Sequence, residues 1–119
     1  MQISKCVYFA TDSGKVPVEE FINNSHHWTQ QKFFSAVDLL KEYGKKLPEP
    51  HAKKLTDEIY ELRFIGGEGK IRALYFFYFD DKVVFTNAFV KKTKRTPKKE
   101  IELAENRRRR YFERMRDNK

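Results

Sequence analysis

The chain has 119 residues, which is enough for one domain with a two-layer core. Its 11 phenylalanines and 6 tyrosines argue against disorder. The net charge of +8 is unevenly spread: residues 1–90 hold 12 basic and 12 acidic residues, whereas residues 91–119 hold 13 and 5. A cation excess at one end is typical of a polyanion-binding surface, and a solvated helical charge run is the alternative.

Cysteine content and hydropathy indicate the cellular compartment in which the protein resides. Cys6 is the single cysteine, so the chain has neither an internal disulfide nor a cysteine zinc site, which fits a reducing environment. No apolar run approaches the roughly 20 residues that span a bilayer. The first ten residues also lack the basic start and apolar run of an export signal. We therefore expect a soluble cytoplasmic protein.

The N-terminal part predicts one strand and two helices. Residues 3–9 are rich in strand-forming side chains and are followed by turn residues. Pro17 suits the first turn of a short helix. A second helix is expected from about Thr29 to Tyr43, where apolar side chains form a wide stripe and Gly44 supplies a left-handed cap. Two successive helices predict an αα-hairpin on one face of a sheet.

Three strands are expected between residues 59 and 90. In Ile59–Phe64, apolar residues alternate with Glu61 and Arg63, as in a half-buried strand. Residues 65–70 contain three glycines and predict a flexible hairpin connection, because the lysine and hydroxyl residue of a phosphate-binding loop are missing. Residues 71–79 and 83–90 are almost continuously apolar, which suits central strands.

The turn after Phe79 leaves the register of the last two strands open. If Phe79 pairs with residue 82, Arg72 shares a face with Lys91; if Phe79 pairs with residue 83, Arg72 shares a face with Lys92. A slip of one residue exchanges the two faces of a strand. Either register places one lysine close to Arg72.

A basic helix is expected at the C-terminal end. Thr96 and Pro97 predict its start, with a side-chain cap followed by proline in the first turn. The run Arg107–Arg110 covers a full turn and therefore cannot all face a core. Together, the elements predict an α+β fold in a single domain over residues 1–119: an antiparallel sheet of about four strands, the αα-hairpin on one face and the C-terminal basic helix.

The sequence resembles the RelE/HigB superfamily of type II toxin–antitoxin toxins, especially its phage-derived, HigB-like branch. The resemblance is carried by Tyr60–Phe64, Arg72, Leu74–Phe77, Phe89–Thr93, Thr96–Pro97, Glu100–Glu102, Ala104 and Arg107. It implies a RelE-like α+β endoribonuclease that cuts messenger RNA in the ribosomal A site without a cofactor. The implied partners are messenger RNA, the ribosome and a neutralising antitoxin with a helix-turn-helix domain.

The resemblance also implies the site. Arg63 and Arg72 take the family's basic positions on the central strands, and Lys91, Lys92 and Lys94 take the basic patch after the last strand. Some family members place a tyrosine or histidine near this patch, but residues 79–110 contain neither. The further residues expected to contact RNA are Arg95, Lys98, Lys99, Arg107 and Arg108.

The chemistry assigns different tasks to these cations. Arginine stays protonated and its planar fork suits a phosphate, so we expect Arg63 and Arg72 to hold the scissile phosphate. A lysine among other cations has a lowered pKa, so Lys91, Lys92 or Lys94 is expected to transfer protons.

Three alternatives stay open at this stage. Arg63 and Arg72 could form ordinary ion pairs with Glu58, Glu61 or the turn aspartates. The chain could also be a noncatalytic nucleic-acid-binding module of a phage regulator, or a basic subunit that binds an acidic protein. No metal is expected, because the three histidines lack a second ligand at zinc spacing.

Overall fold

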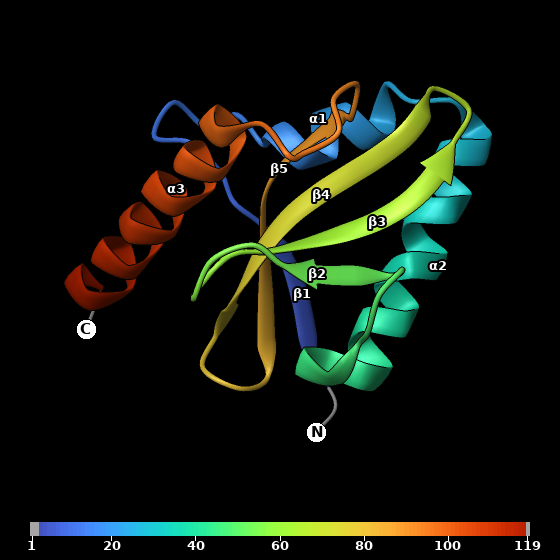
Figure 1. Cartoon of the computed structure of the whole chain (residues 1–119). Coiled ribbons are helices and arrows are strands. Elements are labelled where there is room, and N and C mark those ends of the chain that lie inside the picture. Colours follow the sequence, from blue (N-terminus) through green and yellow to red (C-terminus); the bar gives the residue numbers. More distant parts are fainter. Residues whose placement is uncertain (1–2, 119) are drawn as a thin grey trace.

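A computed structural model describes residues 3–118 and contains a five-stranded sheet with helices on both faces (Figure 1). Met1 and Gln2, which begin the segment considered for an export signal, and Lys119, the last C-terminal cation, lie outside the described residues. The strands are β1 (Lys5–Tyr8), β2 (Ala52–Lys54), β3 (Tyr60–Gly66), β4 (Gly69–Tyr78) and β5 (Lys82–Val90). The helices are α1 (Pro17–Asn23), α2 (His27–Tyr43), the 3-10 turn η1 (Gly44–Lys46) and α3 (Lys98–Asp117).

The predicted α+β fold is confirmed, with one strand more than expected. The sheet order is β1-β5-β4-β3-β2; β1 runs parallel to β5 and all other neighbours are antiparallel. The additional strand β2 pairs with β3 over only three residues, two of them lysines, so neither its length nor its composition indicates a strand. None of the described helices is long and apolar enough to cross a membrane.

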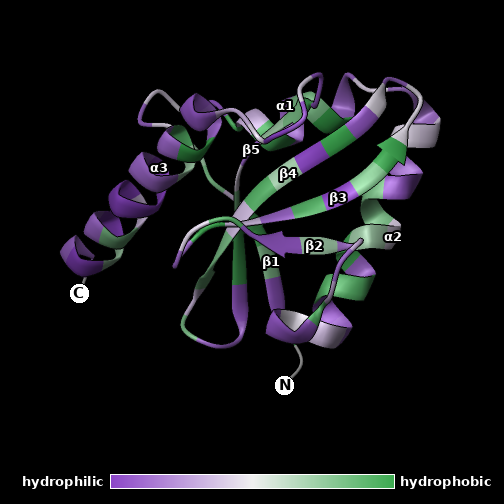
Figure 2. Cartoon of the chain, in the orientation of Figure 1, coloured by the Kyte–Doolittle hydropathy of each residue, from purple (hydrophilic) through white to green (hydrophobic). Residues whose placement is uncertain are grey.

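Both faces of the sheet carry a core. On one face, α1 and α2 pack around Phe33, whose ring lies 6.0 Å from that of Phe64 and 5.5 Å from that of Phe85. On the other face, Leu74 and Phe76 pack against α3. Figure 2 shows hydrophilic residues over most of α3, so only a narrow stripe of this helix joins the core. The part of the sheet that α3 leaves uncovered is where the cations gather.

The predicted strand boundaries need correction around the first hairpin. Residues 65 and 66 continue β3, and β4 begins at Gly69, so the expected flexible connection shrinks to Gly67 and Glu68. That turn is tied to the start of α2: Gly67 N donates to Thr29 Oγ1 at 2.8 Å, and His26 N donates to Glu68 Oε2 at 2.7 Å. The glycines therefore form a fixed hairpin turn.

The register between β4 and β5 differs from both expectations at the turn. Tyr78, not Phe79, pairs with Lys82. If this register continued along the strands, Ala88 would lie opposite Arg72 and Lys92 would share its face.

A β-bulge then shifts the register by one residue. Leu74 pairs with Asn87 and Tyr75 with Phe85, so Thr86 is the extra residue on β5. Its hydroxyl is fully buried and donates to Leu74 O and Asn87 Oδ1. Beyond the bulge, the pairing partner of Arg72 is Phe89, and Lys91 rather than Lys92 shares its face.

The start of α3 also departs from expectation. The helix begins at Lys98, with Pro97 at the N-cap and no side-chain cap hydrogen bond. The predicted Thr96 cap is therefore wrong. The Thr96 hydroxyl bonds Glu61 on β3 instead. The buried Asn87 on β5 donates to Glu100 Oε1 at 2.9 Å, which fixes the first turn of α3 against the sheet.

Candidate functional site

Arg63 on β3 and Arg72 on β4 lie directly opposite each other in the sheet. Strand alternation puts both on the same face as Glu61. Two like charges at opposed positions repel each other. Such a pair therefore needs a compensating anion, and Glu61 supplies it.

Glu61 is completely buried and holds three groups together. Its Oε1 atom lies 2.8 Å from Arg63 Nε and 3.4 Å from Arg72 Nε, while Oε2 accepts a hydrogen bond from the Thr96 hydroxyl. The ion-pair alternative is thus confirmed for Glu61. It is wrong for Glu58, which pairs with Arg108 at 3.1 Å.

The ion pair with Glu61 does not satisfy all hydrogen-bond donors of Arg72. Its Nη1 atom donates to Ile71 O at 3.0 Å, but the buried Nε atom makes no hydrogen bond with any described residue. Burial lowers the pKa of Arg72, against the opposing effect of Glu61, yet an arginine remains a cation. A buried donor that makes no hydrogen bond is costly even with the Glu61 carboxylate 3.4 Å away, and a second anion would supply that bond.

Lys91 completes the group of cations around Arg72. Its backbone N donates to Lys70 O at 2.7 Å, which extends the β4–β5 pairing past Val90. Burial lowers the pKa of Lys91, and the charges of Arg72 and Arg63 lower it further, while Glu61 opposes them. Lys91 is among the lysines expected to transfer protons, and its pKa is shifted in the direction that this role requires.

A cationic cleft of about 400 Å³ lies beside these residues. It is lined by Lys53, Lys54, Leu55, Arg63, Lys91, Lys94, Arg95, Thr96 and Ile101. The structure therefore brings together Arg63, Lys91, Lys94 and Arg95 from the predicted set. It adds Lys53, which pairs with Glu61 across β2 and β3 and shares its face. Sequence reasoning missed Lys53 because nothing indicated β2.

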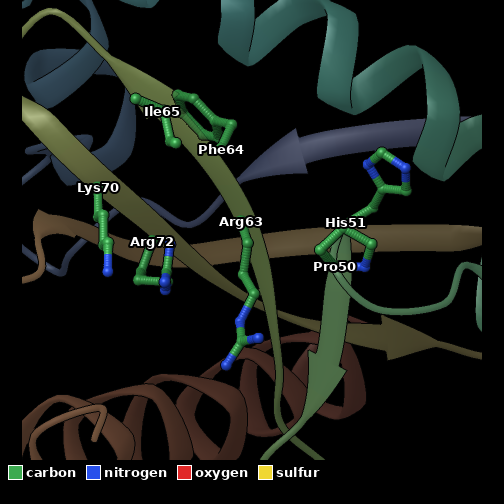
Figure 3. A pocket seen from close by; sticks show the side chains of 7 residues that line it. All are labelled: Pro50, His51, Arg63, Phe64, Ile65, Lys70 and Arg72. Atoms are coloured by element: carbon green, nitrogen blue, oxygen red, sulfur yellow. The ribbon is translucent and has the colours of Figure 1, made fainter. Parts of the chain in front are cut away.

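A second cavity, of about 290 Å³, adjoins the first at Arg63. It is lined by Pro50, His51, Arg63, Phe64, Ile65, Lys70 and Arg72, mostly by apolar atoms. In Figure 3, Arg63, Lys70 and Arg72 point to one side of the strands, whereas the rings of Phe64 and His51 lie on the other side. The sequence offers His51 only as one of three histidines that lack a second zinc ligand, and it does not predict the neighbours of His51 in this cavity.

Other predicted residues lie outside both cavities. Lys92 is exposed on the segment between β5 and α3, and Lys98 and Lys99 are exposed in the first turn of α3. Arg107 is partly buried and its Nη1 donates to Thr86 O at 2.7 Å. Arg108 covers the ring of Phe112 at 4.5 Å from the centroid. The hydrogen bond of Arg107 to Thr86 and the ion pair of Arg108 with Glu58 hold α3 on the molecule, whereas Phe112 belongs to α3 itself.

Within residues 3–118, no group of three or more histidine, cysteine, aspartate or glutamate side chains is placed to hold a metal ion. Sequence comparison gives one family match: a model described as "Phage derived protein Gp49-like (DUF891)" matches residues 20–109. The matched region contains every residue that lines the two cavities. No match was found among curated proteins.

Proposed function

The chain belongs to the phage-derived Gp49-like family, and on this premise we propose that it is the toxin of a type II toxin–antitoxin system. The proposed activity is metal-independent cleavage of messenger RNA on the ribosome, held in check by a cognate helix-turn-helix antitoxin. The RelE/HigB resemblance supplies the reaction. The observation that carries the proposal is the buried Arg72 Nε, which pairs with Glu61 at 3.4 Å but makes no hydrogen bond within residues 3–118, beside Arg63 and Lys91.

Arg63 and Arg72 are suited to bind the scissile phosphate. Cleavage by the neighbouring 2′-hydroxyl passes through a phosphorane-like state whose oxygens gain negative charge. Two guanidinium groups fixed by Glu61 before the substrate arrives need little rearrangement to stabilise that charge. Arg72 Nε, which makes no hydrogen bond to Glu61 or to any other described residue, provides one donor that the phosphate would satisfy.

The two proton transfers fall to lysines on opposite sides of the cleft. Neutral Lys91 takes the proton of the 2′-hydroxyl as the bond between O2′ and phosphorus forms. As the bond between phosphorus and O5′ breaks, Lys53 gives a proton to the departing oxygen. The products are a 2′,3′-cyclic phosphate and a 5′-hydroxyl. Lys94 and Arg95, which line the same cleft, would bind the neighbouring backbone phosphates, and Lys92, Lys98 and Lys99 extend this basic surface.

The cleavage rate should rise with pH because Lys91 acts only when it is neutral. Its lowered pKa makes the neutral form more abundant at a given pH than for a free lysine, and below that pKa the rate should rise about tenfold per pH unit. Lys91→Arg keeps the charge but cannot deprotonate, so it should lower the rate by roughly 100-fold or more and remove this rise. Single-turnover cleavage measured from about pH 6 to about pH 9 tests this. An Arg variant with the wild-type rate and profile would mean that Lys91 acts only through its charge.

Induced expression tests the proposal as a whole. We expect growth arrest and messages cut to 5′-hydroxyl ends, both suppressed when the antitoxin is expressed with the toxin. Purified protein added to translating ribosomes should give the same cuts. Tolerated expression with RNA binding but no cuts would instead identify a noncatalytic nucleic-acid-binding module. Partner binding that needs no RNA and persists at high salt, also without cuts, would identify a protein-interaction subunit.

A further inference from the structure

We infer that the cavity lined by Pro50, His51, Phe64 and Ile65 is a subsite for one nucleobase of the bound RNA. The inference rests on the proposed function and deepens it, because it concerns which part of the RNA enters this cavity. The cationic cleft can hold phosphates and cannot distinguish bases, since phosphate contacts carry no sequence information. A subsite for a base would give the site a sequence preference.

The cavity exists because β2 is shorter than β3. Pairing of β2 with β3 ends at Ala52, and the hydrogen bond from Arg63 N to His51 O (2.8 Å) extends it by one residue. β3 continues to Gly66. By strand alternation, Ile65 turns its peptide N–H and C=O to the same edge as Arg63. The cavity edge therefore carries a backbone donor and acceptor side by side, which matches the donor and acceptor groups along the edge of a base.

The walls of the cavity suit a flat, apolar ring. The ring of Phe64 is held by Phe33 of α2, and the exposed His51 adds a second ring (Figure 3). Ile65, the next-to-last residue of β3, is 67% exposed, a high exposure for a large apolar side chain. Bases stack on aromatic and imidazole rings and are read along their polar edges in single-stranded RNA.

Charge favours a nucleotide over an apolar protein side chain. Arg63, Lys70 and Arg72 line the cavity along one side, and no acidic side chain lines it. Arg63 also lines the cationic cleft, so one guanidinium lies at the boundary between an apolar and a cationic site. A nucleotide has the same division, with its base joined through the sugar to a phosphate. A base in the cavity would therefore place its phosphate at Arg63.

The test uses single-stranded 2′-O-methyl oligonucleotides, which bind but cannot be cut because the attacking hydroxyl is blocked. One member of the series is intact, and each of the others lacks a single base. We expect the wild-type protein to bind one abasic member about tenfold more weakly than the intact strand, the effect of losing one stacked base. The double variant His51→Ala and Ile65→Ala should bind these two strands equally. His27→Ala, which removes an exposed histidine of α2 that does not line the cavity, should behave as the wild type.

The outcomes separate this inference from the proposed function. If the wild-type protein binds all abasic members equally, or if the double variant keeps the difference, the inference is wrong and the cavity is left to a side chain of a partner protein. RNA cleavage is measured separately. An abasic effect without any cleavage would keep the base subsite but overturn the nuclease. Failure to bind any member of the series would overturn the inference, whereas the absence of cleavage on ribosomes would overturn the nuclease.

Discussion

Replacing Arg72 by alanine should lower the rate of RNA cleavage by about 100- to 1000-fold, the usual effect of removing one preorganised donor from a developing oxyanion. Arg72 has the buried Nε without a hydrogen-bond partner, and it lies opposite Arg63 on the neighbouring strand. The rate is measured under single-turnover conditions, so that weaker RNA binding is not mistaken for slower chemistry. In cells, the same variant should no longer arrest growth.

The Arg72 variant needs controls because the side chain also pairs with Glu61. Arg116→Ala makes the same chemical change on an exposed part of α3 and should keep the wild-type rate. Arg63→Lys keeps a charge next to Glu61 but loses the planar fork, so it should fold normally and still cut slowly. Thermal melting of each variant tells whether lost activity reflects unfolding. A folded Arg72→Ala protein that cuts at the wild-type rate would show that Arg72 is only structural.

Strand faces could be predicted because they depend on local alternation. The division of β3 into an apolar face and a face with Glu61 and Arg63 follows from a period of two residues. The position of Lys91 could not be predicted, because it depends on the bulge at Thr86. The bulge depends on buried contacts, here those of the Thr86 hydroxyl with Leu74 O and Asn87. Such contacts leave no repeating pattern in the sequence from which the bulge could be predicted.

The candidate site was predictable only on the strands that the sequence revealed. Arg63 and Arg72 belong to strands with clear patterns, and Lys91 directly follows such a strand. Lys53 lies on β2, a strand of three residues that forms only by pairing with the edge of β3. The role of Thr96 was missed for a similar reason: a threonine before a proline is typical of a helix cap, but a buried carboxylate from β3 binds its hydroxyl instead. Contacts with β3, which is distant in the sequence from Thr96, determine both the formation of β2 and the partner of the Thr96 hydroxyl.

Glu61→Ala should have the largest effect on stability of any single change in the site. The substitution leaves Arg63 and Arg72 opposed without their shared anion and frees the Thr96 hydroxyl. Breaking a buried charge pair by removing one partner costs about 3–5 kcal/mol, and we expect a decrease in the free energy of unfolding near the lower figure, since the arginine side chains keep 20% and 10% of their exposure. Urea unfolding followed by circular dichroism measures this change.

A double-mutant cycle identifies the cause of that loss. If repulsion between the arginines and their uncompensated charge dominates, adding Arg72→Met to Glu61→Ala should recover part of the lost stability, with a coupling energy of about 1–3 kcal/mol between the two positions. If the loss came only from the cavity left by the carboxylate, the two substitutions would add. Cleavage distinguishes the roles further. Glu61→Gln keeps the shape of the side chain and its contact with Thr96, so the variant should remain folded. Its arginines are held less firmly because the negative charge is lost. We expect the activation free energy of cleavage to rise by more than the free energy of unfolding falls.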